Sequence, residues 1–231
     1  MPGYQHYSFD LWLTLIKSNP DFKLERAKYF FCHYNPLQKT LEQVQAIFRQ
    51  VDVMCNAINE KTGGNIDAEE MYLMVICQLA EDPAGMAMVD VEVLYDTMEE
   101  LLFDYLPQLY CNNTPGVLQR LKEDPAKSLN ILSKTGFIKG KTLRRILQEL
   151  SIGSYFDFQL YSDELGLSKP NKILFEHLLH QVHSHRGALQ PASIIHIGDN
   201  PLADIAGAKT VGISSLLVNS NQQSILTLLE P

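Results

Sequence analysis

Four segments, far apart in the chain, each place a charged or hydroxyl side chain at or shortly after the end of an apolar run. The residues are Asp10 in "YSFD", Ser133 in "NILS", Lys169 in "GLSKP" and Asp199 in "IIHIGD". Two carboxylates suit Mg²⁺, a hard cation that bridges to phosphate oxygens. A hydroxyl and an ammonium group can bind the remaining phosphate oxygens. This set of groups favours chemistry on a phosphoryl group, with Asp10 free to attack as a nucleophile.

The elements that would position these residues alternate between strands and helices. Short runs rich in Ile, Leu and Phe predict buried strands, which we place at residues 5–10, 128–133, 156–162, 193–199 and 214–219. Segments with helical periodicity separate the later strands, and this alternation predicts right-handed crossovers. We therefore expect an α/β fold with a Rossmann-like parallel sheet of about five strands. Because parallel strands end at the same edge of a sheet, the four residues should meet there.

The region between the first and second predicted strands has a different character. Residues 20 to about 112 place apolar residues at spacings of three and four, which predicts several helices. Gly63 and Gly64 are expected to end the second of these helices. We divide the chain into an α/β core, residues 1–17 and 113–231, and an inserted helical cap, residues 18–112. An insertion directly after the first strand would hang over the edge of the sheet where ligands bind.

The composition excludes some classes of partner. The 231 residues carry a formal net charge of -8, which argues against nucleic acid and against an anionic membrane surface as the main partner. No run of 18 uninterrupted apolar residues occurs, and the amino terminus lacks a basic segment followed by an apolar one. We expect a cytoplasmic protein that binds a small phosphorylated molecule. The sequence carries no signal for an oligomeric state.

Four stretches together resemble the motifs of the haloacid dehalogenase superfamily. They are, in chain order, "FDLWLTLI", "NILSKTGF", "SDELGLSKPNKILFEHLL" and "IIHIGDNPLADIAGAKTVGI". The resemblance covers the whole predicted core, about 130 residues, and the helical insertion falls where the superfamily's first type of cap (C1) is inserted. It implies a hydrolase, and for its phosphatase members an aspartyl-phosphate intermediate and Mg²⁺.

The resemblance also implies roles for residues around the phosphoryl group. Asp10 would be the nucleophile, and Thr14 would close the first motif in a structural role. Ser133, followed by Lys134, would hold the phosphoryl group. Lys169 would offset the negative charge of the nucleophile and the phosphate.

A Mg²⁺ site is implied by the same motifs. Asp10 would be a ligand as well as the nucleophile, and Trp12 would contribute its main-chain carbonyl. Asp199 would be the acidic ligand of the last motif. Asp204, five residues further on, would support the site from the same loop.

Trp12 departs from the motif, because phosphatases of the superfamily carry a second Asp at this position. That Asp protonates the leaving group and then deprotonates the attacking water, and an indole can do neither. Three functions stay open: a Mg²⁺-dependent phosphoryl hydrolase, a metal-independent 2-haloacid dehalogenase, and a phosphate-binding relative with little turnover. Asp199 favours the first, since a metal-free dehalogenase does not need a metal-binding acid. The aromatic residue at 12 and two cap arginines, Arg26 and Arg49, favour the second.

The histidines have simpler explanations. His177, His180, His183 and His185 are expected on the solvated face of a helix. His196 alternates into one face of a buried strand, where we expect a core histidine with its hydrogen bonds satisfied.

Overall fold

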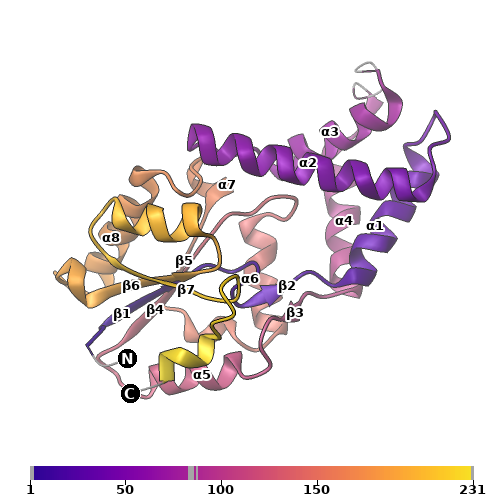
Figure 1. Ribbon diagram of the computed structural model, residues 1–231. Helices are drawn as coiled ribbons and strands as arrows, with labels where there is room; N and C mark the ends of the chain where they lie inside the picture. The colour runs from indigo at the N-terminus through magenta and orange to yellow at the C-terminus, as the bar shows by residue number, and fades with distance from the viewer. Residues whose placement is uncertain (1–2, 83–85, 87, 230–231) are drawn as a thin grey trace.

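A parallel sheet with helices on both faces forms one part of the molecule, and a group of helices beyond the carboxyl edge of the sheet forms the other (Figure 1). The computed structural model describes residues 3–82, 86 and 88–229. The few remaining positions of the predicted core and cap, 1–2, 83–85, 87 and 230–231, lie outside the described residues.

The sheet has the strand order β5-β4-β1-β6-β7, and all neighbours in it pair in parallel. The strands are β1 (His6–Phe9), β4 (Ser128–Ser133), β5 (Phe158–Tyr161), β6 (Ile194–Gly198) and β7 (Ser214–Leu217). The predicted α/β class with a parallel sheet of about five strands is confirmed. β1 lies in the centre, between the strands of the second and fourth motifs, so Asp10 emerges between the loops that carry Ser133 and Asp199.

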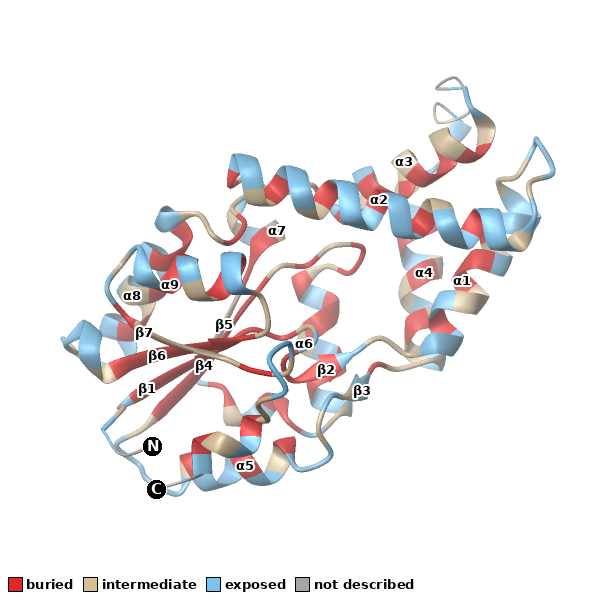
Figure 2. Ribbon diagram, viewed as in Figure 1, coloured by how far each residue is buried: buried red, intermediate tan, exposed pale blue. Residues whose placement is uncertain are grey.

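Apolar side chains cover both faces of the sheet, and β1, β4 and β6 are buried throughout (Figure 2). One face packs against α5 (Thr114–Lys122), α6 (Gly140–Glu149) and the 3₁₀ helix η5 (Ile225–Leu229). The other packs against α8 (Lys172–Arg186) and α9 (Gly207–Lys209). The buried strands also carry polar side chains, and these are paired within the sheet: the ring nitrogens of His6 lie 2.7 Å from the Ser128 hydroxyl and 2.8 Å from Asn130 Oδ1.

The inserted region is helical, as the periodicity predicts. It contains α1 (Pro20–His33), α2 (Leu41–Thr62), α3 (Ala68–Ala80) and α4 (Val91–Asp104). Gly63 ends α2 in a left-handed conformation, with φ of 72°, so the predicted stop is confirmed. Two short strands that the periodicity does not predict, β2 (Ile16–Lys17) and β3 (Gln108–Leu109), pair antiparallel where the chain enters and leaves this region.

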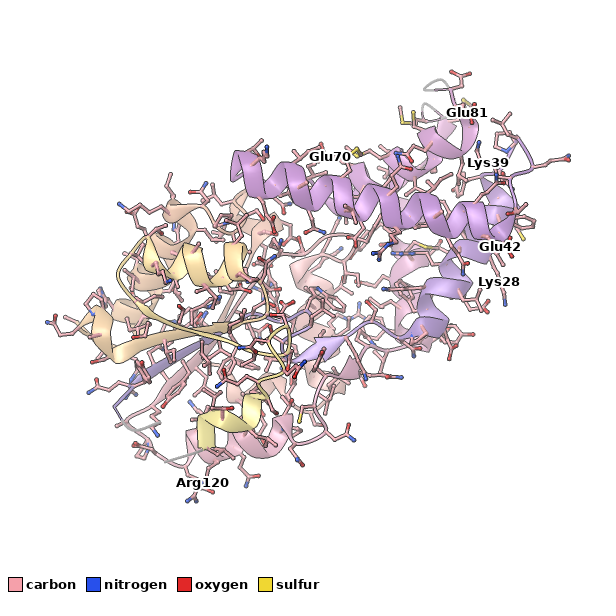
Figure 3. All side chains as sticks on the ribbon, in the orientation of Figure 1. Lys28, Lys39, Glu42, Glu70, Glu81 and Arg120 are labelled. Atoms are coloured by element: carbon pink, nitrogen blue, oxygen red, sulfur yellow. The ribbon has the colours of Figure 1, made fainter. Side chains whose placement is uncertain are left out.

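The helical region has a hydrophobic core of its own. Phe30, Phe48, Tyr72 and Met98 belong to a buried cluster to which the rest of the chain contributes only Phe137 among the described residues. At its far end, away from the sheet, Lys39 forms an ion pair with Glu81 (Figure 3). A separate core is consistent with the predicted division at residues 18–112. The function of this region as a cap stays a prediction.

The carboxyl end of α2 contacts the loop of the third motif. The Gly63 carbonyl accepts hydrogen bonds from the Ser168 amide and the Asn171 side chain, both at 3.0 Å. A Cβ at position 63 would lie 2.7 Å from the Asn171 amide nitrogen, so a glycine suits both the backbone conformation and the close approach. α2 therefore bridges the helical region and the edge of the sheet, above α7 (Ser162–Leu165) (Figure 1).

The fourth motif folds differently from a simple α-helix. The segment between β6 and β7, where the periodicity predicts a helix, is a π-helix, η4 (Pro201–Ala206), followed by the single turn of α9. The Asn200 side chain caps it by accepting from the amides of Leu202 and Ala203. The wide turn keeps Asp204 next to the strand it follows, and its carboxylate lies where a Cβ on Gly198 would be.

Candidate active site

A buried lysine joins two carboxylates at the carboxyl edge of the sheet. The ammonium group of Lys169 lies 2.6 Å from Asp10 Oδ1 and 2.6 Å from Asp204 Oδ1. It also donates to the main-chain carbonyl of Leu132, at 2.9 Å. Lys169 is only 1% exposed. Three acceptors therefore surround a cation that has almost no access to water, and residues from all four motifs meet at this edge.

The segment after β1 holds Asp10 from its other side. The Asp10 amide donates to the Ile197 carbonyl at 2.8 Å, which continues the ladder between β1 and β6. The chain then turns, with Leu13 in a left-handed conformation at φ 59°, and Thr14 Oγ1 donates to Asp10 Oδ2 at 3.0 Å. Both Asp10 oxygens are thus engaged, and the structural role predicted for Thr14 is to orient this carboxylate.

Asp204 is held by a second set of donors. Its Oδ2 accepts from the Asn200 amide at 3.0 Å, and its Oδ1 lies 3.1 Å from His196 Nε2 as well as next to Lys169. His196 Nδ1 lies 3.0 Å from the Ser8 hydroxyl. His196 is thus the satisfied core histidine that the strand pattern predicts. It also supports a site residue, which the strand pattern does not indicate.

Asp199 completes a group of three acids. One carboxylate oxygen from each of Asp10, Asp199 and Asp204 lies within 4.8 Å of the others. Burial, with added repulsion from Asp10 and Asp204, raises the pKa of Asp199 to about 7. Three carboxylates in such a space repel one another unless a cation compensates them, and Lys169 compensates only two at contact distance.

Burial and neighbouring charges shift the pKa values of Asp10, Asp204 and Lys169. Burial raises the pKa of Asp10, an effect that Lys169 opposes and Asp204 strengthens. Burial also acts on Asp204, but Lys169 and His196 outweigh it and lower its pKa. For Lys169, burial disfavours the charge, and the two carboxylates overcome it and raise the pKa. The geometry places the Lys169 side-chain nitrogen between the two carboxyl groups, 2.6 Å from each.

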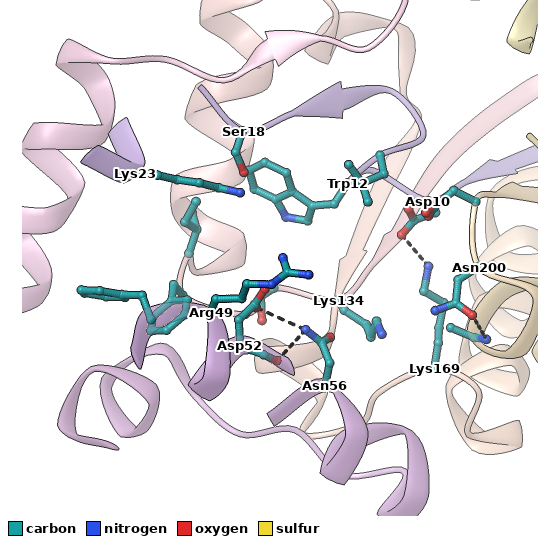
Figure 4. A pocket seen from close by; sticks show the side chains of 18 of the residues that line it. Asp10, Trp12, Ser18, Lys23, Arg49, Asp52, Asn56, Lys134, Lys169 and Asn200 are labelled. Atoms are coloured by element: carbon teal, nitrogen blue, oxygen red, sulfur yellow. Dashed lines mark hydrogen bonds and ion pairs between the residues drawn. The ribbon is translucent and has the colours of Figure 1, made fainter. Parts of the chain in front are cut away.

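A cavity of about 600 Å³ opens from these acids toward the helical region. Among the predicted site residues, Asp10, Trp12, Lys134, Lys169, Asp199 and Asp204 line it. Figure 4 shows Trp12 beside Asp10, and Lys23 and Arg49 reaching in from the opposite side. Both predicted cap arginines, Arg26 and Arg49, line the same cavity.

Ser133 is less well placed than the other predicted site residues to contact a ligand in the cavity. It does not line the cavity among the residues described, and its Oγ donates to the Lys134 carbonyl at 2.9 Å. To bind a phosphoryl group it would have to exchange this contact. Lys134 lines the cavity, but its ammonium group already forms an ion pair with Glu60 of α2 at 2.9 Å. The roles predicted for both residues stay predictions.

Two cavity residues escaped the sequence interpretation. Glu60 accepts from Lys134 and, at 3.1 Å, from the side chain of Asn200, so one carboxylate of α2 joins two motif loops of the core. Asn200 follows Asp199 directly in the fourth motif, and its place in "GDNP" was the available signal. Glu60 carries no such signal, since it is one of three acids on an amphipathic helix, with Glu42 and Asp52.

A family model for haloacid dehalogenase-like hydrolases matches residues 8–218. The chain belongs to this family. No helix in the part of the chain that the structure describes is long and apolar enough to cross a membrane.

Two named relatives share less than a third of the aligned residues with this chain. Human haloacid dehalogenase-like hydrolase domain-containing protein 3 is 29% identical over 129 residues, which are 56% of this chain and 49% of that protein. Ribulose-1,5-bisphosphate 5-phosphatase of Halopiger xanaduensis is 26% identical over 170 residues, 74% of this chain and 66% of the relative. The chain thus spans about half the length of the first of these relatives.

Solved structures share the fold over nearly the whole hydrolase chain. The putative HAD-hydrolase YfnB from Bacillus subtilis, bound to magnesium, superposes with a TM-score of 0.72 at 17% identity, covering 96% of this chain and 92% of that one. L-2-haloacid dehalogenase from Xanthobacter autotrophicus, with chloropropionic acid covalently bound, gives a TM-score of 0.57 at 17% identity, covering 93% and 77%. At these identities the likeness concerns the fold alone.

Proposed function

We propose that this hydrolase cleaves a small phosphorylated molecule in a Mg²⁺-dependent reaction that proceeds through a phosphoryl group on Asp10. The observation that carries the proposal is the position of Asp10. Its carboxylate contacts Lys169 and Thr14, lies with two further acids in a group whose oxygens span less than 4.8 Å, and opens onto a cavity of about 600 Å³.

The donor set fits Mg²⁺. Asp10, Asp199 and Asp204 supply carboxylate oxygens, which this hard cation prefers, and the main-chain carbonyl of Trp12 would add a fourth ligand. The raised pKa of Asp199, caused by burial and by the two neighbouring carboxylates, is the kind of repulsion that a divalent cation relieves. When bound, Mg²⁺ would neutralise phosphate oxygens and so lower the charge repulsion that a nucleophilic carboxylate meets.

The protein's own residues then perform two displacements. A carboxylate oxygen of Asp10 attacks phosphorus, the bond from phosphorus to the substrate oxygen breaks, and the leaving group departs with that bond pair. Lys169 and Thr14 keep the attacking carboxylate oriented and ionised. A water molecule then attacks the phosphorus of the aspartyl-phosphate, releases inorganic phosphate and restores Asp10.

Trp12 sets the limit of this chemistry. It offers no group that can protonate an alkoxide leaving group or take a proton from water, help that is worth about 10² to 10⁴ in rate. Substrates whose leaving group departs without protonation should therefore turn over best. The name of the Halopiger relative, a sugar bisphosphate phosphatase, supports a small phosphorylated substrate of some kind.

The test uses p-nitrophenyl phosphate and acetyl phosphate, which both have good leaving groups. We expect hydrolysis that requires Mg²⁺, stops with EDTA and is absent in Asp10→Asn. Asp10→Asn removes the nucleophile but keeps the size of the side chain, so it also serves as the blank for contaminating phosphatases. Equal rates with and without metal would contradict the proposal.

A 2-haloacid dehalogenase is the second candidate. The observation that favours it is that Trp12, Arg26 and Arg49 line the same cavity as Asp10, so an aromatic ring and two guanidinium groups are available to a haloacid bound there. Halide leaves without protonation, which makes the missing acid at position 12 harmless. Chloride release from 2-chloropropionate in EDTA, with no hydrolysis of the phosphate esters, would select this function.

A phosphate-binding relative with little turnover is the third candidate, and the absence of an acid at Trp12 favours it. Trp12 is the only tryptophan of the chain and lines the cavity, so its fluorescence reports on ligands there. A fluorescence change with Mg²⁺ and orthovanadate, in a protein that hydrolyses none of the substrates above, would select this candidate.

A further inference from the structure

Three cations on the helical side of the cavity lack an acidic partner. Lys23 and Arg26 of α1 and Arg49 of α2 all line the cavity that contains Asp10. None of them makes an ion pair with any carboxylate among the residues described. On the opposite side of the same cavity, Lys134 and Lys169 are both paired with carboxylates.

Arg26 is the most unusual of the three because it is buried. It is 8% exposed, and its guanidinium lies over the rings of Phe48 at 4.2 Å, Phe137 at 4.6 Å and Phe22 at 5.2 Å. Its Nε is buried with no hydrogen-bond partner. The protein therefore holds a charged group in an apolar cage and leaves one of its donors unused.

The aromatic contacts alone do not account for this arrangement. Rings stabilise the face of a guanidinium, but its N–H groups point outward in the plane and need acceptors. A buried donor without an acceptor costs about 1–3 kcal/mol. An anionic group in the cavity would accept from the free donor and would give the buried charge a partner of opposite sign.

Arg49 and Lys23 extend the same positive region. Both side chains are exposed, and Figure 4 shows them directed toward Trp12 from the helical side. Two acids lie on this side as well. Asp52 is exposed and accepts a hydrogen bond from Asn56, and Glu60 is paired with Lys134 of the core. Neither acid pairs with the three cations in the described structure, so the positive charge is available to a ligand.

We infer that Lys23, Arg26 and Arg49 form a second anion site, which selects phosphomonoesters that carry another anionic group, a phosphate or a carboxylate, at the end remote from the scissile phosphate. This inference rests on the proposed function, because it assigns the reacting phosphate to Asp10 and the remote group to the cap. The part of the substrate between its two anionic groups would pack against three aromatic residues that also line the cavity, Trp12, Phe22 and Phe137.

The experiment compares substrates that differ only at the remote end. For chains of two to eight carbons, kcat/KM is measured with Mg²⁺ for ω-hydroxyalkyl phosphates, ω-carboxyalkyl phosphates and alkanediol bisphosphates. The variants are Arg26→Met and Arg49→Met, which remove charge but keep an unbranched side chain. Lys28→Met is the matched control, since Lys28 is also on α1 but lies outside this cavity, where it pairs with Glu25 (Figure 3).

We expect kcat/KM for at least one series with a remote anionic group to exceed that for the ω-hydroxyalkyl phosphates by about tenfold or more, which is the scale of one hydrogen bond to a charged group. The ratio should fall toward one in both arginine variants and stay unchanged in Lys28→Met. Preference for the bisphosphates or for the carboxylates identifies the remote group. Arg49 is exposed, so Arg49→Met tests the site even if Arg26→Met fails to fold.

No preference for a remote anion, or a preference that both arginine variants retain, would overturn the inference while leaving the proposed function intact. The proposed function fails only if p-nitrophenyl phosphate and acetyl phosphate are not hydrolysed either. If the alkyl phosphates alone do not turn over, because Trp12 cannot protonate an alkoxide, or if no substrate does, binding decides the inference. Alkane bisphosphonates and carboxyalkyl phosphonates should then bind more tightly than ω-hydroxyalkyl phosphonates in calorimetric titrations with Mg²⁺, and equal affinities for all three would overturn it.

Discussion

The two sides of the cavity differ in how they compensate charge. On the sheet side, Lys169 is enclosed by Asp10, Asp204 and a main-chain carbonyl, with almost no exposed surface. On the helical side, Arg26 has aromatic neighbours and Arg49 is exposed, and neither has a carboxylate partner in the described chain. A side that must hold a nucleophile in one orientation needs fixed partners, whereas a side that recognises a ligand needs charge that the ligand can complete.

The largest expected effect is the loss of stability when the buried cation on the sheet side of the cavity is removed. Lys169→Met should lower the free energy of unfolding by about 3–5 kcal/mol, because it leaves two buried carboxylates without their cation. Urea denaturation measures this free energy. Arg49→Met is the control: it removes no buried ion pair, so its stability should change little. The double variant Asp10→Asn/Lys169→Met should be less destabilised than the two single losses added together. Equal stability of Lys169→Met and the parent chain would show that the ammonium is not the cation that compensates these acids.

The next effect concerns the residue that lies between the two sides. Trp12→Asp should raise kcat for an alkyl phosphate by about 10², since it supplies a group that can protonate the alkoxide. The gain should be much smaller for p-nitrophenyl phosphate, whose leaving group needs no proton. Trp12→Asn is the control, because it has the same size as Asp but cannot exchange a proton. An equal gain in the Asn variant would mean that removing the indole, not adding the acid, changed the rate.

Mg²⁺ should act on the sheet side of the cavity alone, because its proposed carboxylate ligands, Asp10, Asp199 and Asp204, all lie there. At a Mg²⁺ concentration ten times its dissociation constant, the free energy of unfolding should rise by about 1.4 kcal/mol, since the ion binds the folded chain. EDTA should reverse the gain, and Asp199→Asn, which removes a proposed ligand, should abolish it. Lys28→Met should keep it. A chain that Mg²⁺ does not stabilise, with intact acids, would favour the metal-free dehalogenase.

How far the sequence predicts this site depends on whether a residue is placed by the sheet. Asp10, Lys169 and Asp204 meet because parallel strands end at a common edge, and the apolar runs make those strands predictable. β2 and β3 are two residues each, too short for any period. Gln108 and Leu109 fall within the segment, 20 to about 112, that the periodicity predicts to be helical, but they form β3. Pro107 explains why the helix does not continue, because proline cannot donate the hydrogen bond that a helix interior requires.

The side chains of the helical region are harder to predict, because helix periodicity shows which face is buried but not against what. The sequence marked Arg26 and Arg49 as cap arginines, and both reach the cavity. The sequence does not indicate that Arg26 is buried and Arg49 exposed. Glu60 meets Lys134 and Asn200 only through the docking of α2 on the core, which depends on tertiary packing.

The smallest expected effect tests that docking. Glu60→Gln removes the charge that joins α2 to Lys134 but keeps a side-chain oxygen that can accept from Asn200. Both partners of the ion pair are about one-fifth exposed, so the loss should be about 1 kcal/mol or less. If the contact holds the helical region against the sheet, the amides at the carboxyl end of α2 should exchange hydrogen up to about fivefold faster, while those of β1 and β4 stay unchanged. Uniform acceleration across both regions would instead mean that Glu60 contributes to global stability and that other contacts between the two regions, such as the ion pair of Lys139 with Glu69, hold them together.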